Sequence, residues 1–136
     1  MIKVIIIEDE KPSARRLQRM LSHIGIEAQA MLHSVSEAVA WFEANDHPDL
    51  ILLDIQLSDG LSFEIFERVE VKSAIIFTTA YDEYALKAFK LNSIDYLLKP
   101  IDDEELEAAI EKFKTNHSGA HDLLVDINQI KKLRNH

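Results

Sequence analysis

The sequence feature that most constrains the fold is an apolar run that ends at a carboxylate. Residues 49–53 (DLILL) have no polar face to expose to water after the first aspartate, as expected for a central strand covered on both sides in a parallel sheet. In open α/β sheets the functional crevice lies outside the carboxyl ends of the strands, and Asp54 follows this run directly. Asp54 is therefore the first candidate for a functional residue. On its own it fits equally well as the start of a turn towards residues 58–60 (SDG).

The rest of the chain alternates between apolar runs and helical patterns. The predicted strands are residues 2–7, 26–33, 49–53, 74–79 and 94–98, and the predicted helices are residues 12–24, 35–42, 61–69, 82–91 and 102–113. Ser34 with Glu37 and Asp102 with Glu105 match capping boxes at two helix starts, and weak alternation in 26–33 indicates an edge or near-edge strand. Five strands alternating with five helices through short connections predict an α/β fold, a doubly wound parallel sheet with helices on both faces.

Length and charge limit the possible functions. At 136 residues and 47% hydrophobic residues, the chain is long enough for one domain with a sizeable core and a short appendage. The net charge is −9, and residues 1–116 carry 12 basic and 22 acidic side chains. This acidic body would repel a phosphate backbone, so we expect DNA contact only through another domain.

Composition also bears on the cellular compartment. The chain has no cysteine, which removes disulfides, thiolate metal sites and cysteine nucleophiles, and which fits a reducing compartment. No signal-peptide pattern opens the chain, and no apolar run approaches 18 residues. We therefore expect a cytoplasmic protein with no membrane span.

Polar residues follow four of the predicted strands. Glu8 and Asp9 come after the first strand, Asp54 after the third, Thr79 at the end of the fourth and Lys99 after the fifth. If the first strand lies beside the third, the three carboxylates converge. Two unit charges about 4 Å apart repel by roughly 4 kcal/mol at an effective dielectric constant of 20, so such a cluster needs a cation. A hard, oxygen-preferring ion such as Mg²⁺ would meet that need.

These residue types are suited to phosphoryl transfer. Asp54 would act as a nucleophile towards phosphorus, Mg²⁺ and Lys99 would neutralise the phosphoryl oxygens, and the Thr79 hydroxyl would donate a hydrogen bond to one of them. The chain has only three glycines, and neither a P-loop nor a GxGxxG turn can be built from them. We therefore expect the phosphoryl group to come from another protein.

Four motifs, in the right order at four strand ends, closely resemble the receiver domain of two-component response regulators. They are residues 5–10 (IIIEDE), 52–56 (LLDIQ), 77–81 (FTTAY) and 95–100 (DYLLKP). The resemblance covers residues 1–116. It implies a flavodoxin-like (βα)5 sandwich with strand order 2-1-3-4-5, which accepts a phosphoryl group on Asp54 from a sensor histidine kinase.

The resemblance also implies the metal ligands. Glu8 and Asp9 correspond to the acidic pair that holds Mg²⁺ together with Asp54, and Gln56 corresponds to the residue that gives its backbone carbonyl to the metal. Glu8 stands where the family often has aspartate, which puts the metal affinity in question but not the role.

By the same resemblance, the switch residues lie on the last two strands. Thr79 corresponds to the switch hydroxyl, Tyr96 to the switch aromatic and Lys99 to the phosphate-binding lysine, and the bond before Pro100 is expected to be cis. Thr78 is the alternative for the hydroxyl. Thr79 is preferred because a small residue, Ala80, follows it.

A longer motif narrows the resemblance. Residues 79–89 (TAYDEYALKAF) and 95–101 (DYLLKPI) are similar to receivers that precede a LytTR-type DNA-binding domain. Residues 117–136 resemble the start of the linker to such a domain and are predicted to be partly helical. We expect a fragment of a transcriptional regulator that forms a homodimer through residues 82–116 on phosphorylation; a stand-alone receiver is the alternative.

Two rival functions remain open at this point. A haloacid-dehalogenase-type phosphatase also uses an aspartate after an apolar strand, but it requires a second aspartate where this chain has Gln56, so we expect no enzyme that turns over substrate. A degenerate receiver that only binds other proteins is the other rival. The basic row Lys11, Arg15 and Arg19 is either a solvated helix face or a docking patch for an acidic partner such as the kinase.

Overall fold

The structure of the chain is a computed structural model, and it describes residues 2–80 and 93–116. The helix predicted for residues 82–91 and the linker predicted for residues 117–136 lie outside the described residues. Within the described part, no helix is both long enough and apolar enough to cross a membrane.

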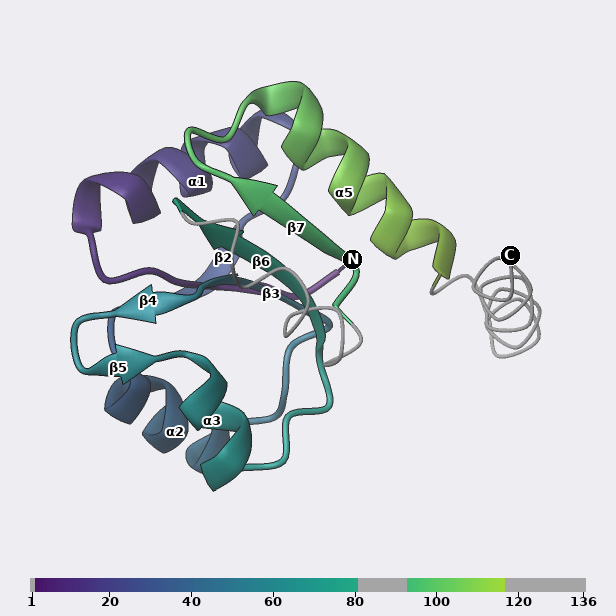
Figure 1. Cartoon of the computed structure of the whole chain (residues 1–136). Coiled ribbons are helices and arrows are strands. Elements are labelled where there is room, and N and C mark those ends of the chain that lie inside the picture. Colours follow the sequence, from purple (N-terminus) through teal and green to yellow (C-terminus); the bar gives the residue numbers. More distant parts are fainter. Residues whose placement is uncertain (1, 81–92, 117–136) are drawn as a thin grey trace, which may run out of the picture.

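One parallel sheet forms the centre of the molecule (Figure 1). Its strands, in spatial order, are β2 (Ala28–Leu32), β1 (Val4–Ile7), β3 (Leu50–Asp54), β6 (Ala74–Thr79) and β7 (Asp95–Leu98). All four neighbouring pairs are parallel. Counted along the chain, this is the order 2-1-3-4-5, so the flavodoxin-like prediction and the edge position of the second strand are confirmed.

Helices cover both faces of the sheet. The described helices are α1 (Lys11–His23), α2 (Val35–Ala44), α3 (Phe63–Arg68) and α5 (Asp103–Asn116). Buried side chains of α1 and α5 pack with alternate residues of the strands on one face, and those of α2 and α3 pack on the other (Figure 1). The register of β1 and β3 pairs Ile7 with Leu53, so both strands end at the same edge of the sheet.

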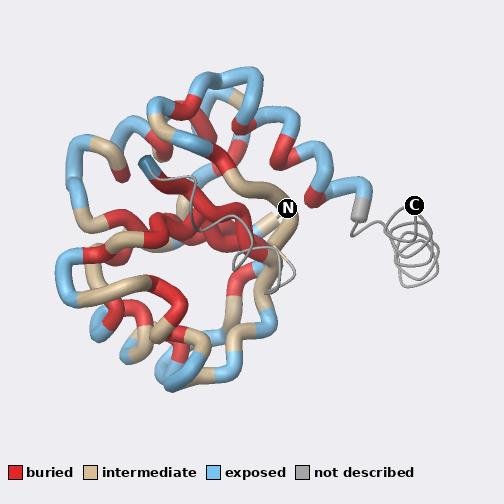
Figure 2. Tube along the Cα trace, in the orientation of Figure 1, coloured by how far each residue is buried: buried red, intermediate tan, exposed pale blue. Residues whose placement is uncertain are grey.

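The apolar runs are buried as their patterns predict. Every residue of β1 and β3 is buried, and the strands form the continuous buried centre in Figure 2. A fully buried leucine or isoleucine side chain contributes roughly 1.5–3 kcal/mol relative to an exposed one. The buried centre of the sheet therefore stabilises the strands that carry the polar groups at its edge.

Local signals fix the helix ends. Pro12 lies in the first turn of α1, and Gly25 closes the helix at φ 80°, where its N–H donates to Ser22 O. Ser34 Oγ accepts from Glu37 N (3.1 Å) at the start of α2. Asp102 Oδ1 accepts from Glu105 N (3.0 Å) at the start of α5.

The connection after β3 differs from the prediction. It forms a small antiparallel hairpin of β4 (Gln56–Leu57) and β5 (Gly60–Leu61), and α3 begins at Phe63 where the pattern predicted a helix from residue 61. Strands of two residues leave no periodicity to detect. Gly60 lies at φ 148°, a backbone conformation that residues with a side chain rarely adopt, so the hairpin favours glycine at this position.

Candidate functional site

Asp54 is the last residue of β3 and lies almost entirely out of solvent, with 5% of its surface exposed. It is paired with Thr78 of β6 in the parallel register. Ile55 N donates to Thr78 O (3.1 Å) and Gln56 N donates to Asp54 Oδ1 (3.4 Å). The sheet therefore fixes the backbone of Asp54, and the next residues fix its side chain.

Glu8 and Asp9 follow β1, the strand next to β3. Glu8 is fully buried, its N–H donates to Leu32 O (2.9 Å), and its Oε2 accepts from Glu10 N (3.1 Å). Carboxylate oxygens of Glu8, Asp9 and Asp54 all lie within 4.8 Å of one another. The structure thus brings together the three carboxylates that the strand ends predicted.

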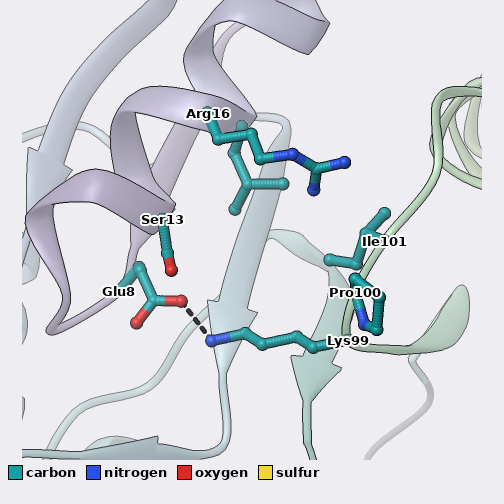
Figure 3. A pocket seen from close by; sticks show the side chains of 7 residues that line it. Glu8, Ser13, Arg16, Lys99, Pro100 and Ile101 are labelled. Atoms are coloured by element: carbon teal, nitrogen blue, oxygen red, sulfur yellow. Dashed lines mark hydrogen bonds and ion pairs between the residues drawn. The ribbon is translucent and has the colours of Figure 1, made fainter.

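Lys99 reaches this cluster from the end of β7. Its Nζ forms ion pairs with Glu8 Oε1 and with Asp54 Oδ2 (3.0 Å), and Figure 3 shows the lysine side chain extended towards Glu8. Its backbone N–H donates to Thr79 O (2.7 Å), which anchors the residue to β6. The Lys99–Pro100 peptide bond is cis. One ammonium therefore lies between two buried carboxylates.

Burial and proximity shift the pKa values of these groups. Desolvation raises the pKa of Glu8 above its ordinary value, and the nearby Asp54 carboxylate adds to the rise, while the Lys99 ammonium opposes it. Desolvation and the neighbouring Glu8 raise the pKa of Asp9. Burial alone would lower the pKa of Lys99, but its hydrogen bond to Glu8 and the charge of Asp54 raise it overall. The cluster holds more negative charge than the one lysine balances.

The candidate switch residues lie on β6 and β7. Thr78 and Thr79 are both fully buried, and Thr78 Oγ1 has no hydrogen-bond partner among the described residues. Tyr96 pairs with Phe77 and is partly buried against the core cluster shared with α2 and α3. Both threonines are therefore placed near the carboxyl edge, and Thr78 is the one opposite Asp54 in register.

Residues 4–111 match the response regulator receiver domain. The chain belongs to that family. Sensory transduction protein LytT of Bacillus anthracis is 37% identical over 118 residues, which cover 84% of this chain and 48% of LytT. Transcriptional regulatory protein BtsR of Salmonella typhi is 37% identical over 136 residues, which cover 95% of this chain and 55% of BtsR. This receiver spans about half the length of the curated relatives it matches.

Solved receivers share the fold. A two-component response regulator from Clostridium difficile superposes with a TM-score of 0.75 at 27% identity, covering 88% of this chain and all of that chain (100%). The response regulatory domain of mrkE from Klebsiella pneumoniae gives 0.73 at 30% identity, covering 84% and 96%. Because the relatives are regulators, the family favours signalling over the phosphatase alternative.

The acidic cluster of this receiver fits a hard divalent cation. All three clustered side chains offer carboxylate oxygens, the ligands that Mg²⁺ prefers, and their spacing allows one ion to contact them together. Gln56, which is half-buried, is the first residue of β4 and lies two residues after Asp54. The donor set and its excess negative charge are what a magnesium site requires.

A groove of about 480 Å³ lies beside the cluster, between α1 and the segment after β7. Figure 3 shows Ser13 and Arg16 of α1 facing Pro100 and Ile101 across it, with Glu8 and Lys99 at one end. The basic row Lys11, Arg15 and Arg19 is exposed on the same helix but does not line this groove.

Two contacts around the site were not predicted from the sequence. His33 Nδ1 is hydrogen-bonded to the Glu8 carbonyl oxygen (2.8 Å), and the Asp59 carboxylate contacts the start of α2. Both join segments more than 20 residues apart, and no local pattern indicates either contact.

Proposed function

We propose that this receiver accepts a phosphoryl group on Asp54 from the phosphohistidine of a sensor histidine kinase. One observation supports the proposal above all: Asp54 is nearly buried, yet its carboxylate lies within 4.8 Å of Glu8 and Asp9 oxygens and 3.0 Å from Lys99 Nζ. A carboxylate with no functional role is rarely buried among other carboxylates.

The proposed transfer forms one bond and breaks one. An Asp54 carboxylate oxygen attacks phosphorus, the bond from phosphorus to the kinase imidazole nitrogen breaks, and the imidazole leaves with the electron pair. Glu8, Asp9, Asp54 and the Gln56 carbonyl would hold Mg²⁺, which would neutralise charge on the phosphoryl oxygens. Lys99, already beside Asp54, would contact another of those oxygens.

Phosphorylation would change one surface of the receiver. We propose that Thr79 moves towards the phosphoryl group, with Thr78 as the alternative, and that Tyr96 turns inward. The surface affected would span residues 82–116, of which the structure describes β7 and α5. An ion pair between Lys112 Nζ and Asp95 Oδ2 (3.2 Å) joins these two elements. Homodimerisation through this surface would then act on DNA through a further domain, in keeping with a relative that is a transcriptional regulatory protein, BtsR.

Phosphorylation by acetyl phosphate with Mg²⁺ tests the assignment without a kinase. The intact mass of the wild-type chain should rise by one phosphoryl group, and Asp54→Asn should abolish that rise. Asp49→Asn is the matched control, because Asp49 precedes the same strand but is exposed. Undiminished labelling of Asp54→Asn would contradict the proposal. Failure to bind beryllofluoride with millimolar Mg²⁺ would favour a degenerate receiver.

The switch has a separate test. Light scattering should show that the wild-type chain gains mass on phosphorylation, and Tyr96→Ala should reduce that gain without preventing labelling. An unchanged gain would remove Tyr96 from the switch.

The docking face also has its own test. We propose that the kinase docks on the α1 side that carries Lys11, Arg15 and Arg19, all of them exposed. Arg15→Glu should slow transfer from the kinase while labelling by acetyl phosphate keeps its rate. Equal rates of phosphoryl transfer from the kinase to the variant and to the wild type would contradict docking at this row and favour the alternative, a solvated helix face.

A further inference from the structure

The Asp59 carboxylate makes contacts that the proposed phosphoryl transfer does not use. Asp59 lies in the turn between β4 and β5. Its Oδ1 accepts a hydrogen bond from Val35 N (2.7 Å), and its Oδ2 accepts from Ser36 N (3.0 Å) and Ser36 Oγ (3.2 Å). The partners precede it by 24 and 23 residues, so the contact joins two segments of the fold rather than closing a local turn.

The chemistry of a helix start explains why this contact is favourable. The first N–H groups of a helix have no partner within the helix, and the helix dipole favours a negative charge there. Burial alone would raise the pKa of Asp59, but the hydrogen bonds from Val35 N and Ser36 N lower it overall. The helix has its own cap in Ser34, so Asp59 is a second cap supplied by another segment.

The same end of α2 contacts the other side of the acidic cluster. His33, two residues before α2, is hydrogen-bonded through Nδ1 to the Glu8 carbonyl (2.8 Å), and Leu32 O accepts from Glu8 N (2.9 Å). Residues 32–36 therefore contact the segment with Glu8 and Asp9 on one side and the β4–β5 hairpin on the other.

The hairpin connects Asp59 to Gln56, the proposed ligand that follows Asp54. Gln56 pairs with Leu61 and Leu57 pairs with Gly60, so the two arms of the hairpin move together. Leu57 is buried, and Gln56 N donates to Asp54 Oδ1. A shift of Asp59 away from α2 would therefore move Gln56 relative to Glu8.

We propose that Asp59 is a positioning residue for the cation site. By fixing the β4–β5 hairpin to the start of α2, it sets the spacing between the Gln56 carbonyl and the Glu8 and Asp9 carboxylates. This inference rests on the proposed function, because it takes those groups as Mg²⁺ ligands. A group that orients metal ligands from outside the ligand set commonly changes metal affinity by about 10- to 100-fold.

Calorimetric titration of the chain with MgCl2, without a phosphoryl donor, tests the proposal. Asp59→Ala should raise the Mg²⁺ dissociation constant by about tenfold, the lower end of that range. Ser34→Ala is the matched control, because it also removes a cap at the start of α2, but the hydrogen bond that it removes, from Glu37 N to Ser34 Oγ, lies within the helix and not at the hairpin. It should lower the melting temperature as Asp59→Ala does, and leave the dissociation constant unchanged.

Two gentler variants keep the test valid if Asp59→Ala does not fold. Asp59→Asn keeps one acceptor oxygen and should weaken Mg²⁺ binding less, and Ser36→Ala removes only the hydroxyl donor and should weaken it least. Equal dissociation constants for wild type, Asp59→Asn and Ser34→Ala would overturn the positioning role while leaving the proposed function intact. A wild-type chain that neither binds Mg²⁺ nor accepts a phosphoryl group would instead contradict the proposed function itself.

Discussion

Two aspartates bracket β3 and lie in opposite environments. Asp49, at the amino end, is exposed, and its Oδ2 accepts one hydrogen bond from Lys3 N (2.7 Å). Asp54, at the carboxyl end, is 5% exposed and pairs with the Lys99 ammonium. Water can solvate the first carboxylate, whereas the second depends on a cation supplied by the protein or from solution. Position at the sheet edge, rather than residue type, therefore separates the environments of these two acids.

The difference extends along both edges of the sheet. At the amino edge the loops are joined by backbone and hydroxyl contacts, such as Ala74 N to Asp49 O (3.1 Å) and Ser73 Oγ to Pro48 O (2.6 Å). At the carboxyl edge the strands deliver charged side chains into one cluster. The amino edge therefore stabilises the sheet, and the carboxyl edge is where we propose that the chemistry takes place.

The largest expected difference between the two aspartates is in their contribution to Mg²⁺ affinity. Asp54→Asn removes a proposed ligand and should raise the Mg²⁺ dissociation constant by at least about tenfold, whereas Asp49→Asn should not change it. Calorimetric titration with MgCl2 measures both. Similar constants for the two variants would show that the edges do not differ in this way.

In the absence of Mg²⁺, two lysines from these two edges should differ in their contribution to the free energy of unfolding. Lys99→Ala leaves Glu8 and Asp54 buried without their cation and should lower the free energy of unfolding by about 2 kcal/mol, less than for a fully buried pair because 24% of the Lys99 side chain is exposed. Lys3→Ala changes an exposed side chain and should cost less than about 0.5 kcal/mol. Urea denaturation gives both values, and equal losses would contradict the account. Added Mg²⁺ should recover part of the Lys99→Ala loss.

The smallest expected effect is in pH dependence. The pKa of Glu8 is raised above its ordinary value of 4.5, so between these two values the folded state binds more protons than the unfolded state. In Mg²⁺-free buffer the contribution of Glu8 to the free energy of unfolding should therefore increase as the pH falls from neutral towards 4.5. Glu8→Gln lacks this group, so urea denaturation should show a smaller gain for the variant. Parallel pH profiles would mean that Glu8 has an ordinary pKa in the fold.

The periodicity of the sequence was sufficient to predict the sheet. Buried runs such as residues 50–53 and 4–7 predict central strands of a parallel sheet, whereas the order 2-1-3-4-5 was implied by the resemblance to receivers. The β4–β5 hairpin could not be predicted in this way, because a two-residue strand such as Gln56–Leu57 is too short to show an alternating pattern. The hairpin depends instead on Gly60 and on packing. The helix predicted for residues 82–91 lies outside the described residues and stays a prediction.

The candidate site was predictable where it depends on strand ends. Glu8, Asp54 and Lys99 each follow an apolar run, and parallel strands bring their carboxyl ends to one edge. Asp59 and His33 act across more than 20 residues, and only the tertiary structure reveals their partners. The preference for Thr79 over Thr78 came from the resemblance to receivers and not from the strand pattern, because neighbouring strand residues differ only in the face on which they lie.

Mapping the phosphorylated residue tests the central claim most directly. After treatment with acetyl phosphate and Mg²⁺, borohydride reduction converts an acyl phosphate into an alcohol that peptide mass spectrometry locates. The account predicts that reduction occurs at Asp54 and at none of Glu8, Asp9 or Asp49. Reduction at one of those residues with Asp54 intact would contradict it.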